Sequence, residues 1–240
     1  MEFGKKLEEG RPFGKTGKEI ENILLEFFVN KSTAASAAGT TKISRNTINR
    51  YFNEFRYLIF RSLRKAPRFS GVIEIDEKQY GRRRRPREKR IAKKGEYLPR
   101  YKYGRENTVL VFAILQRDRK GSRVYTHIIK DTKRRTLSPI IHMIVEGGSK
   151  IYSDGHRSYS RLRFNGYKHK AVIHKRSWTN GPGIHINGVE SFFGFSKGLM
   201  KRFCGVPKRT FPLHIKECEF RHNNRGKVLE AMKRLLAERT

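Results

Sequence analysis

The chain has 240 residues, which is enough for one sizeable domain and a smaller one. Hydrophobic residues make up 36% of the chain and include 16 Phe and 10 Tyr, which excludes wholesale disorder. The 55 Lys and Arg residues outnumber the 22 Asp and Glu residues and give a formal net charge of +33. Such a charge indicates a polyanionic partner, of which nucleic acid is the commonest.

The sequence carries no pattern of a membrane or exported protein. No apolar run reaches the roughly 18 residues of a membrane span, and the start lacks the pattern of a signal peptide. The two cysteines, Cys204 and Cys218, form no CxxC pair and have no zinc-site spacing. We therefore expect a cytoplasmic protein with reduced thiols.

Residues 19–66 are predicted to form a small all-α domain, after a flexible arm over residues 1–18. Apolar residues recur at helical spacing over 20–28, followed by a small-residue helix that Ser32 is expected to cap. A longer helix is expected to begin after Ser44 as its N-cap. This order is the helix-turn-helix arrangement, and an ordinary three-helix subdomain is the alternative. The residues expected to reach a DNA major groove are Arg45, Asn46, Thr47, Asn49 and Arg50.

A basic, proline-containing linker over 61–70 leads to a second domain over 71–225. Apolar runs predict strands over 72–79, 107–115, 124–129, 149–153 and 169–173. Helical spacing predicts helices over 136–145, 156–162 and 187–203, and one or two more over 212–239, with 226–240 as a separate C-terminal helix. Three meander strands followed by alternating helices and strands form the order of an RNase H-like α/β fold. We therefore expect a mixed five-stranded sheet flanked by helices.

Three acids lie at suggestive places in this order. Asp76 interrupts the apolar first strand, Asp154 follows the fourth strand, and Glu190 lies in the helix over 187–203. Active sites of RNase H-like proteins use acids at these three places. Two-metal phosphoryl transfer needs carboxylates around two Mg²⁺ ions, and hard oxygen ligands suit Mg²⁺. On the same helix, Asn187 and Lys197 lie on the face of Glu190, so Lys197 is expected to hold a phosphate.

Each acid also has an ordinary explanation. Asp154 precedes Gly155, which is a turn signal, and a lone Glu190 would be a solvated helix residue. Asp76 is harder to explain, because an unpaired buried charge is costly. By strand alternation Glu74 shares the face of Asp76 and is its rival for the same role. The joint occurrence of the three acids in fold order favours the functional interpretation.

The segments IEIDEKQYG, IYSDGHRSY and HINGVESFFGFSKGLMKRF resemble the DDE transposases of insertion sequences, closest to the ISXO-type group. The resemblance covers about residues 70–225. It implies an RNase H-like fold and DNA strand cleavage and transfer at transposon ends, with two Mg²⁺ ions, for which Mn²⁺ can substitute. By motif position Asp76, Asp154 and Glu190 correspond to the metal-binding catalytic acids, and Lys197 to the basic residue after them.

The HxNxxE motif leaves one assignment open, because Asn187 and Glu190 are competitors or partners for the third position of the site. His185 opens the motif and is expected to contact phosphate or to make a structural hydrogen bond. Many relatives carry an N-terminal zinc ribbon, whose cysteines this chain lacks, so end recognition falls to the helix-turn-helix region. The basic run after the first strand is expected to contact substrate phosphates and consists of Arg82, Arg83, Arg84 and Arg85.

The expected partners are transposon-end DNA and target DNA, bound by a homodimer or a larger assembly associated with the nucleoid. Two other functions remain open at this point. One is a non-catalytic, domesticated DNA-binding relative, and the other is a nuclease of the same fold that cuts without strand transfer.

Overall fold

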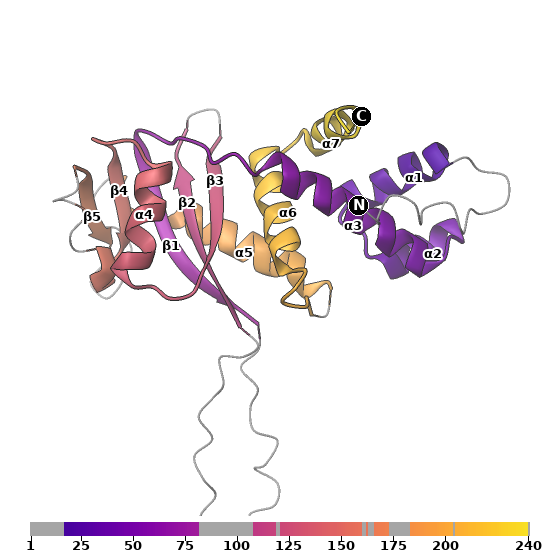
Figure 1. Cartoon of the computed structure of the whole chain (residues 1–240), viewed down its shortest axis with the longest axis horizontal. Helices are drawn as coiled ribbons and strands as arrows, with labels where there is room; N and C mark the ends of the chain where they lie inside the picture. Colours follow the sequence, from indigo (N-terminus) through magenta and orange to yellow (C-terminus); the bar gives the residue numbers. More distant parts are fainter. Residues whose placement is uncertain are drawn as a thin grey trace, which may run out of the picture.

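The computed structural model describes residues 17–81, 108–118, 121–159, 162, 166–172, 183–203 and 205–239. Figure 1 shows a sheet with flanking helices on one side and a cluster of helices on the other. A long helix, α6 (Phe211–Asn223), lies between these two parts. Three hydrophobic clusters follow this arrangement, one on each face of the sheet and one among the N-terminal helices.

The N-terminal helices are α1 (Gly17–Val29), α2 (Ala34–Thr41) and α3 (Arg45–Ser62). The Ser44 hydroxyl accepts a hydrogen bond from the Thr47 N–H at 3.1 Å, which confirms it as the N-cap of α3. The predicted cap of α2 was wrong by one residue. Thr33, not Ser32, accepts the Ser36 N–H at 3.1 Å, because a cap must lie three residues before the N–H that it satisfies.

The sheet consists of β1 (Val72–Tyr80), β2 (Val109–Gln116), β3 (Arg123–Ile129), β4 (Lys150–Asp154) and β5 (Lys168–Val172). Its strand order is β3-β2-β1-β4-β5, with antiparallel β1, β2 and β3, and with β4 and β5 added in parallel. β2 lies between β3 and β1 and is apolar on both faces, as a strand covered on both sides must be. The order and directions confirm the predicted RNase H-like fold.

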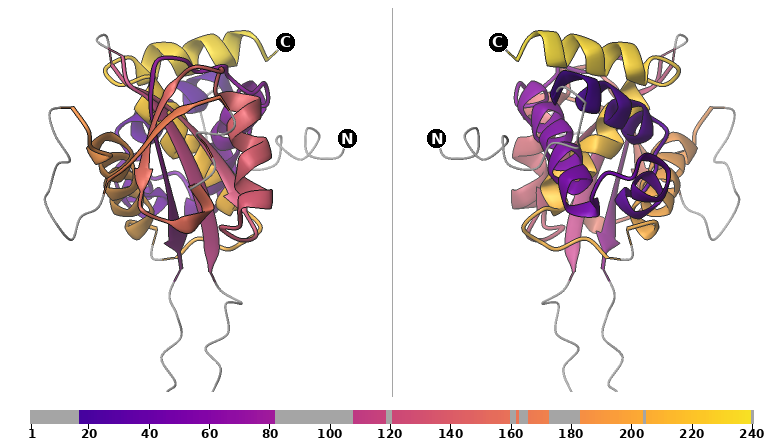
Figure 2. Two further views of the ribbon diagram at one scale, coloured as in Figure 1. Left: turned by 90° about the vertical axis from the view of Figure 1, so that its left-hand side faces the viewer. Right: turned by 90° about the vertical axis from the view of Figure 1, so that its right-hand side faces the viewer.

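Helices α4 (Arg134–Ile144) and α5 (Asn187–Lys201) cover opposite faces of the sheet (Figure 2). Alternation along β1 decides which side chain meets which helix. Ile73 and Ile75 belong to the core beneath α4, whereas Tyr80 packs against Phe193 of α5. The predicted helix over 156–162 is in the described residues a short 3-10 turn, η4 (Arg157–Tyr159).

The C-terminal part forms two helices, α6 and α7 (Val228–Ala237). Phe220 of α6 and Met232 of α7 are buried in the same core as the N-terminal helices. The N-terminal helices and α7 therefore pack as one layer beside the sheet.

The predicted linker between the two parts is held against the sheet domain. Phe69 is 1% exposed, and its backbone exchanges hydrogen bonds with Ile144 and Glu146 at the end of α4.

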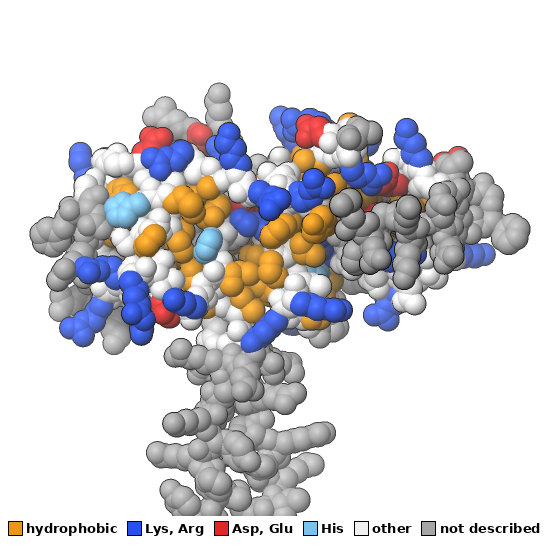
Figure 3. Space-filling view, in the orientation of Figure 1, with side chains coloured by type: hydrophobic (Ala, Val, Ile, Leu, Met, Phe, Trp, Pro, Cys, Tyr) orange, Lys and Arg blue, Asp and Glu red, His pale blue; other side chains and the backbone are white. Residues whose placement is uncertain are grey.

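The surface is strongly basic. In the face seen in Figure 3, Lys and Arg side chains are spread over both the sheet part and the helical part, and acidic side chains are few. None of the helices in the described ranges has both the length and the apolar character that crossing a bilayer requires.

Candidate active site

Asp76 and Asp154 lie side by side on neighbouring strands. The parallel register pairs Glu74 with Tyr152 and Ile75 with Ser153, and Asp76 and Asp154 each follow the last of these pairs by one residue. Residues that continue such a register point to the same face of the sheet, and the charge of Asp154 acts on the Asp76 carboxyl. Asp154 closes β4, while Asp76 is in the middle of β1, and both are on the face that α5 covers.

Asp76 is buried, and the environment disfavours its charge. Its side chain is 7% exposed, and its Oδ1 accepts a hydrogen bond from the Glu77 N–H at 2.8 Å. Burial, helped by the neighbouring charges of Glu77 and Asp154, raises the pKa of the Asp76 carboxyl from 3.8 to about 7, against the hydrogen bond from the Glu77 N–H and the charge of Lys78. In a chain of charge +33, this is a local concentration of carboxylates.

A tyrosine holds a further carboxylate of β1, that of Glu77, which directly follows Asp76 in the sequence. Glu77 points to the opposite face of β1 and accepts a hydrogen bond from the Tyr159 hydroxyl of η4. Burial raises the pKa of Glu77, and burial together with the charges of Glu77, Asp154 and Asp76 raises that of Tyr159. The pair ties the segment after Asp154 to β1.

Helix α5 runs along β1 and passes over Asp76. At one end the Val189 N–H donates to Glu74 at 2.9 Å, and at the other the Ser196 and Tyr80 hydroxyls share a hydrogen bond of 2.5 Å. Burial and the charge of Lys78 lower the pKa of Lys197, and the nearby Asp76 carboxylate partly opposes this effect. Glu190 precedes Lys197 by about two helical turns and therefore lies on the same flank.

The four predicted residues of α5 and its approach differ in exposure. Glu190, Asn187 and Lys197 are exposed, whereas His185 is partly buried. Asp154 and Lys197 each lie close enough to Asp76 for their charges to interact, and Glu190 lies on the same flank of α5 as Lys197. Within the described ranges, no group of three or more His, Cys, Asp or Glu side chains is close enough to hold a metal ion. Among the described residues, Glu190 therefore does not form a three-carboxylate cluster with Asp76 and Asp154.

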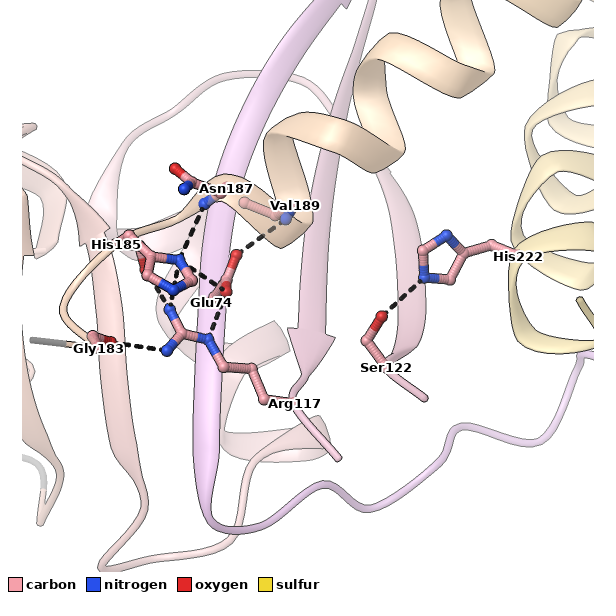
Figure 4. A network of polar contacts seen from close by, with 8 residues as sticks. All are labelled: Glu74, Arg117, Ser122, Gly183, His185, Asn187, Val189 and His222. Carbon is pink, nitrogen blue, oxygen red and sulfur yellow. Dashed lines mark hydrogen bonds and ion pairs between the residues drawn. The ribbon is translucent and has the colours of Figure 1, made fainter. Parts of the chain in front are cut away.

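Glu74, the rival of Asp76, already has partners for both carboxylate oxygens. Oε1 accepts from Arg117 Nε at 2.5 Å and Oε2 from the Val189 N–H. Figure 4 shows Glu74, Arg117 and His185 turned toward one another beneath the first turn of α5, while the side chain of Asn187 points away from them. The sequence reasoning missed Arg117, which follows β2 in what reads as an ordinary basic turn.

The predicted DNA-binding residues lie at two places in the chain. Arg45, Asn46, Asn49 and Arg50 are all exposed, on the first two turns of α3, the helix that follows the turn. Arg82, Arg83, Arg84 and Arg85 lie outside the described residues.

The strand order and directions define a domain of the RNase H-like class. The family model of the ISXO2-like transposase domain matches residues 68–223. The chain is also similar to an uncharacterized transposase-like protein of Haemophilus influenzae, with 35% identity over 102 residues, which are 42% of this chain and 82% of that protein. The chain therefore belongs to the ISXO2-like transposase family.

Solved structures give weaker similarities. The Mos1 strand transfer complex aligns with 95% of this chain and 80% of its own at 10% identity and a TM-score of 0.30. The Mos1 transposase paired-end complex with the left transposon end aligns with 93% of this chain and 82% of its own, at 13% identity and a TM-score of 0.28. The assignment of the fold rests on the strand order and on the family match.

Proposed function

We propose that this transposase uses divalent metal ions to cleave DNA strands at the ends of an insertion sequence and to transfer them to target DNA. One observation carries the proposal, namely that Asp76, which is buried, and Asp154 both follow directly on the last residue pair of the β1–β4 register. The family match supports transposition as the context of this chemistry.

The side chains fit a divalent cation. A buried carboxyl whose pKa is raised to about 7 beside two further acids gains stability when a cation neutralises the group. The donors are carboxylate oxygens, which suit Mg²⁺ or Mn²⁺. We propose that Asp76 and Asp154 hold the ions and that Glu190 joins them. When bound, two such ions activate the attacking oxygen and stabilise the leaving oxygen of the phosphodiester.

The remaining residues would act on the DNA itself. Lys197 on the flank of α5 is a compact cation beside Asp76, suited to hold a phosphate next to the reacting bond. Glu190 shares this flank and carries a carboxylate, the ligand type that Mg²⁺ prefers, so we propose Glu190 as the third acid. Asn187, His185 and the arginines over 82–85 are proposed to contact the substrate backbone.

Removing Asp154 tests the reaction directly. Asp154→Ala should lower Mg²⁺-dependent cleavage of end DNA at least about 10²-fold, because lost metal-based charge stabilisation costs several kcal/mol. Glu190→Ala should match that loss and Asn187→Ala should not. The measurement is a single-turnover cleavage assay that also scores joined products. Full cleavage by Asp154→Ala would refute the site, and cleavage without joining by the wild type would indicate a nuclease.

Helix α3 is proposed to recognise the ends as the second helix of a helix-turn-helix unit. Arg50→Ala should weaken binding to end DNA roughly 10- to 100-fold and reduce the preference for end DNA over scrambled DNA. Arg61→Ala is the matched control, because it removes the same charge from an exposed position at the other end of α3. Competition binding at fixed salt measures both quantities. If both variants lost the same affinity for end DNA and kept the preference for end DNA over scrambled DNA, α3 would contribute only its charge to binding.

A further inference from the structure

Glu74 is an acid buried in the sheet that the proposed chemistry does not use. Its side chain is 1% exposed, and it lies two residues before Asp76 on the same face of β1. It accepts hydrogen bonds from two donors, the Arg117 guanidinium and the Val189 N–H. The N-cap residue of α5, Ile186, makes no side-chain capping bond. The carboxylate of β1 therefore takes the place of the missing cap and also faces the positive end of the helix.

Arg117 extends this contact to the segment that leads into α5. Its Nη1 donates to the Gly183 carbonyl at 2.7 Å, and its Nη2 donates to the His185 carbonyl at 2.5 Å. Nε is bonded to Glu74, so the planar guanidinium is held on three sides, and it stacks 5.1 Å from the Tyr152 ring centre. One side chain after β2 thus fixes both the carboxylate of β1 and the backbone before α5.

The same guanidinium also contacts the His185 ring. Arg117 Nη2 lies 2.9 Å from His185 Nδ1, and the Asn187 N–H also points to that nitrogen, at 3.4 Å. Glu74 Oε1 lies 3.7 Å from the same nitrogen, so His185 Nδ1 faces both members of the Glu74–Arg117 pair. The network therefore holds His185 and the backbone of Asn187, the first two named residues of the HxNxxE motif, as well as the helix that follows.

Gly188 shows how closely the helix is seated on Glu74. A Cβ at this position would lie 3.0 and 3.1 Å from the two Glu74 oxygens and 3.1 Å from Leu115 Cδ2. Any larger residue would push the first turn of α5 away from β1, or the carboxylate out of its place. Glu190 belongs to that first turn and Asp76 to the same strand as Glu74, so the contact sets their separation.

We propose that Glu74 and Arg117 are positioning residues that lock the first turn of α5 on β1 and thereby place Glu190 relative to Asp76. This inference rests on the proposed function, since it assigns Glu190 to the metal site. It also explains why two acids occur on one face of β1. Asp76 would bind the metal, and Glu74 would hold the helix that carries Glu190.

The test compares three variants with two matched controls. Glu74→Gln keeps the shape but offers one acceptor and one donor to two donors, and Arg117→Lys keeps the charge but loses the fork. Gly188→Ala crowds Glu74 directly. Arg123→Lys is the control on the same hairpin, where the guanidinium stacks on Phe69, and Gly198→Ala is the control on α5, where a Cβ meets nothing within 4 Å.

Two quantities are measured on the full chain, at a temperature below the midpoint of thermal unfolding of every variant. Calorimetric titration with MnCl₂ gives the metal affinity, and hydrogen exchange gives the protection of the Val189 and Glu190 amides. We expect the three variants to lose about 10-fold or more in Mn²⁺ affinity, as residues that orient metal ligands do. Exchange at the two amides should accelerate at least about 10-fold. The controls should stay within about twofold of wild type in both.

The outcomes separate this inference from the proposed function. Wild-type Mn²⁺ affinity in Glu74→Gln and Arg117→Lys would overturn the inference alone, provided the wild type binds Mn²⁺ and cuts DNA. Equal losses in the control variants would overturn it too, because the effect would then be general weakening of the fold. A wild type that neither binds Mn²⁺ nor cuts DNA would overturn the proposed function, and the inference with it. If Glu74→Gln fails to fold, Arg117→Lys and Gly188→Ala decide.

Discussion

Asp76→Asn is expected to abolish DNA cleavage and at the same time to make the metal-free protein more stable. The loss of activity should reach about 10³-fold, because the substitution removes a metal-binding carboxylate from the centre of the site. The gain in stability follows from burial, which holds the pKa of the Asp76 carboxyl at about 7 against an ordinary value of 3.8. Burial disfavours the charged form of Asp76, so this carboxylate lowers the stability of the metal-free fold. Residues that function requires are often retained at such a cost in stability.

The sign of the stability effect can be worked out from that shift. Above pH 7 the carboxylate is ionised in both states, and the folded state bears the full penalty of burying the charge, roughly 2–4 kcal/mol. The penalty shrinks as the pH falls from 7 to 4 and vanishes once both states are protonated. Asn should therefore raise the free energy of unfolding at pH 8 and raise it less at pH 5, as measured by urea denaturation in EDTA.

Asp131→Asn is the control of opposite sign. The Asp131 carboxylate accepts hydrogen bonds from the Thr136 hydroxyl and the Lys133 N–H, and these bonds lower its pKa. Its replacement should reduce stability at neutral pH. If Asp76→Asn is also less stable than wild type at pH 8 without metal, the burial of an unfavourable charge at Asp76 is refuted.

Glu217→Gln should destabilise the protein by about 3–5 kcal/mol, the second large effect that we expect. Glu217 of α6 bonds Arg56 of α3 at 2.7 Å and Arg221 at 2.8 Å, and all three side chains are buried. Burial opposes ionisation of Glu217, but the two guanidinium groups outweigh it and lower its pKa. Arg221 also donates to the Phe28 and Val29 carbonyls at the end of α1. Loss of the carboxylate would leave two buried cations without their anion.

Glu21→Gln is the matched control for Glu217→Gln. Glu21 pairs with Arg239 at 2.8 Å and also joins the two ends of the chain, but the Arg239 side chain is 46% exposed. Such a surface pair contributes at most about 1 kcal/mol. Urea denaturation at pH 7 measures both variants. A similar, small effect of the two substitutions would show that the buried pair does not hold the N-terminal helices to α6.

The local elements and the acids could be read from the chain because each leaves a local pattern. The apolar run of β2 and the Ser44 cap follow from propensity and hydrogen-bonding capacity alone. Asp76 was conspicuous because a charge in an apolar strand needs a reason. The place of Asp154 at the end of the strand beside β1 then followed from the order of the elements.

Long-range partners could not be read in this way. Arg117 lies in a turn with several other charges, and nothing near it in the sequence indicates Glu74, 43 positions earlier, as its partner. The docking of α7 on the N-terminal helices, and the pairing of Arg56 with Glu217, likewise depend on how separate elements pack. Strand alternation predicts that Glu74 lies on the buried face of β1. Its contact with the first turn of α5 depends on how the helix packs on the sheet, which the sequence does not show.

The most direct test of the central claim is to locate the metal. Crystals of the protein with end DNA and MnCl₂ can be examined by anomalous scattering, after the same complex has been shown to cleave DNA in solution. We predict manganese bound by the carboxylates of both Asp76 and Asp154. Manganese at Glu74, or away from β1 and β4 altogether, in a complex competent for cleavage would contradict the assignment.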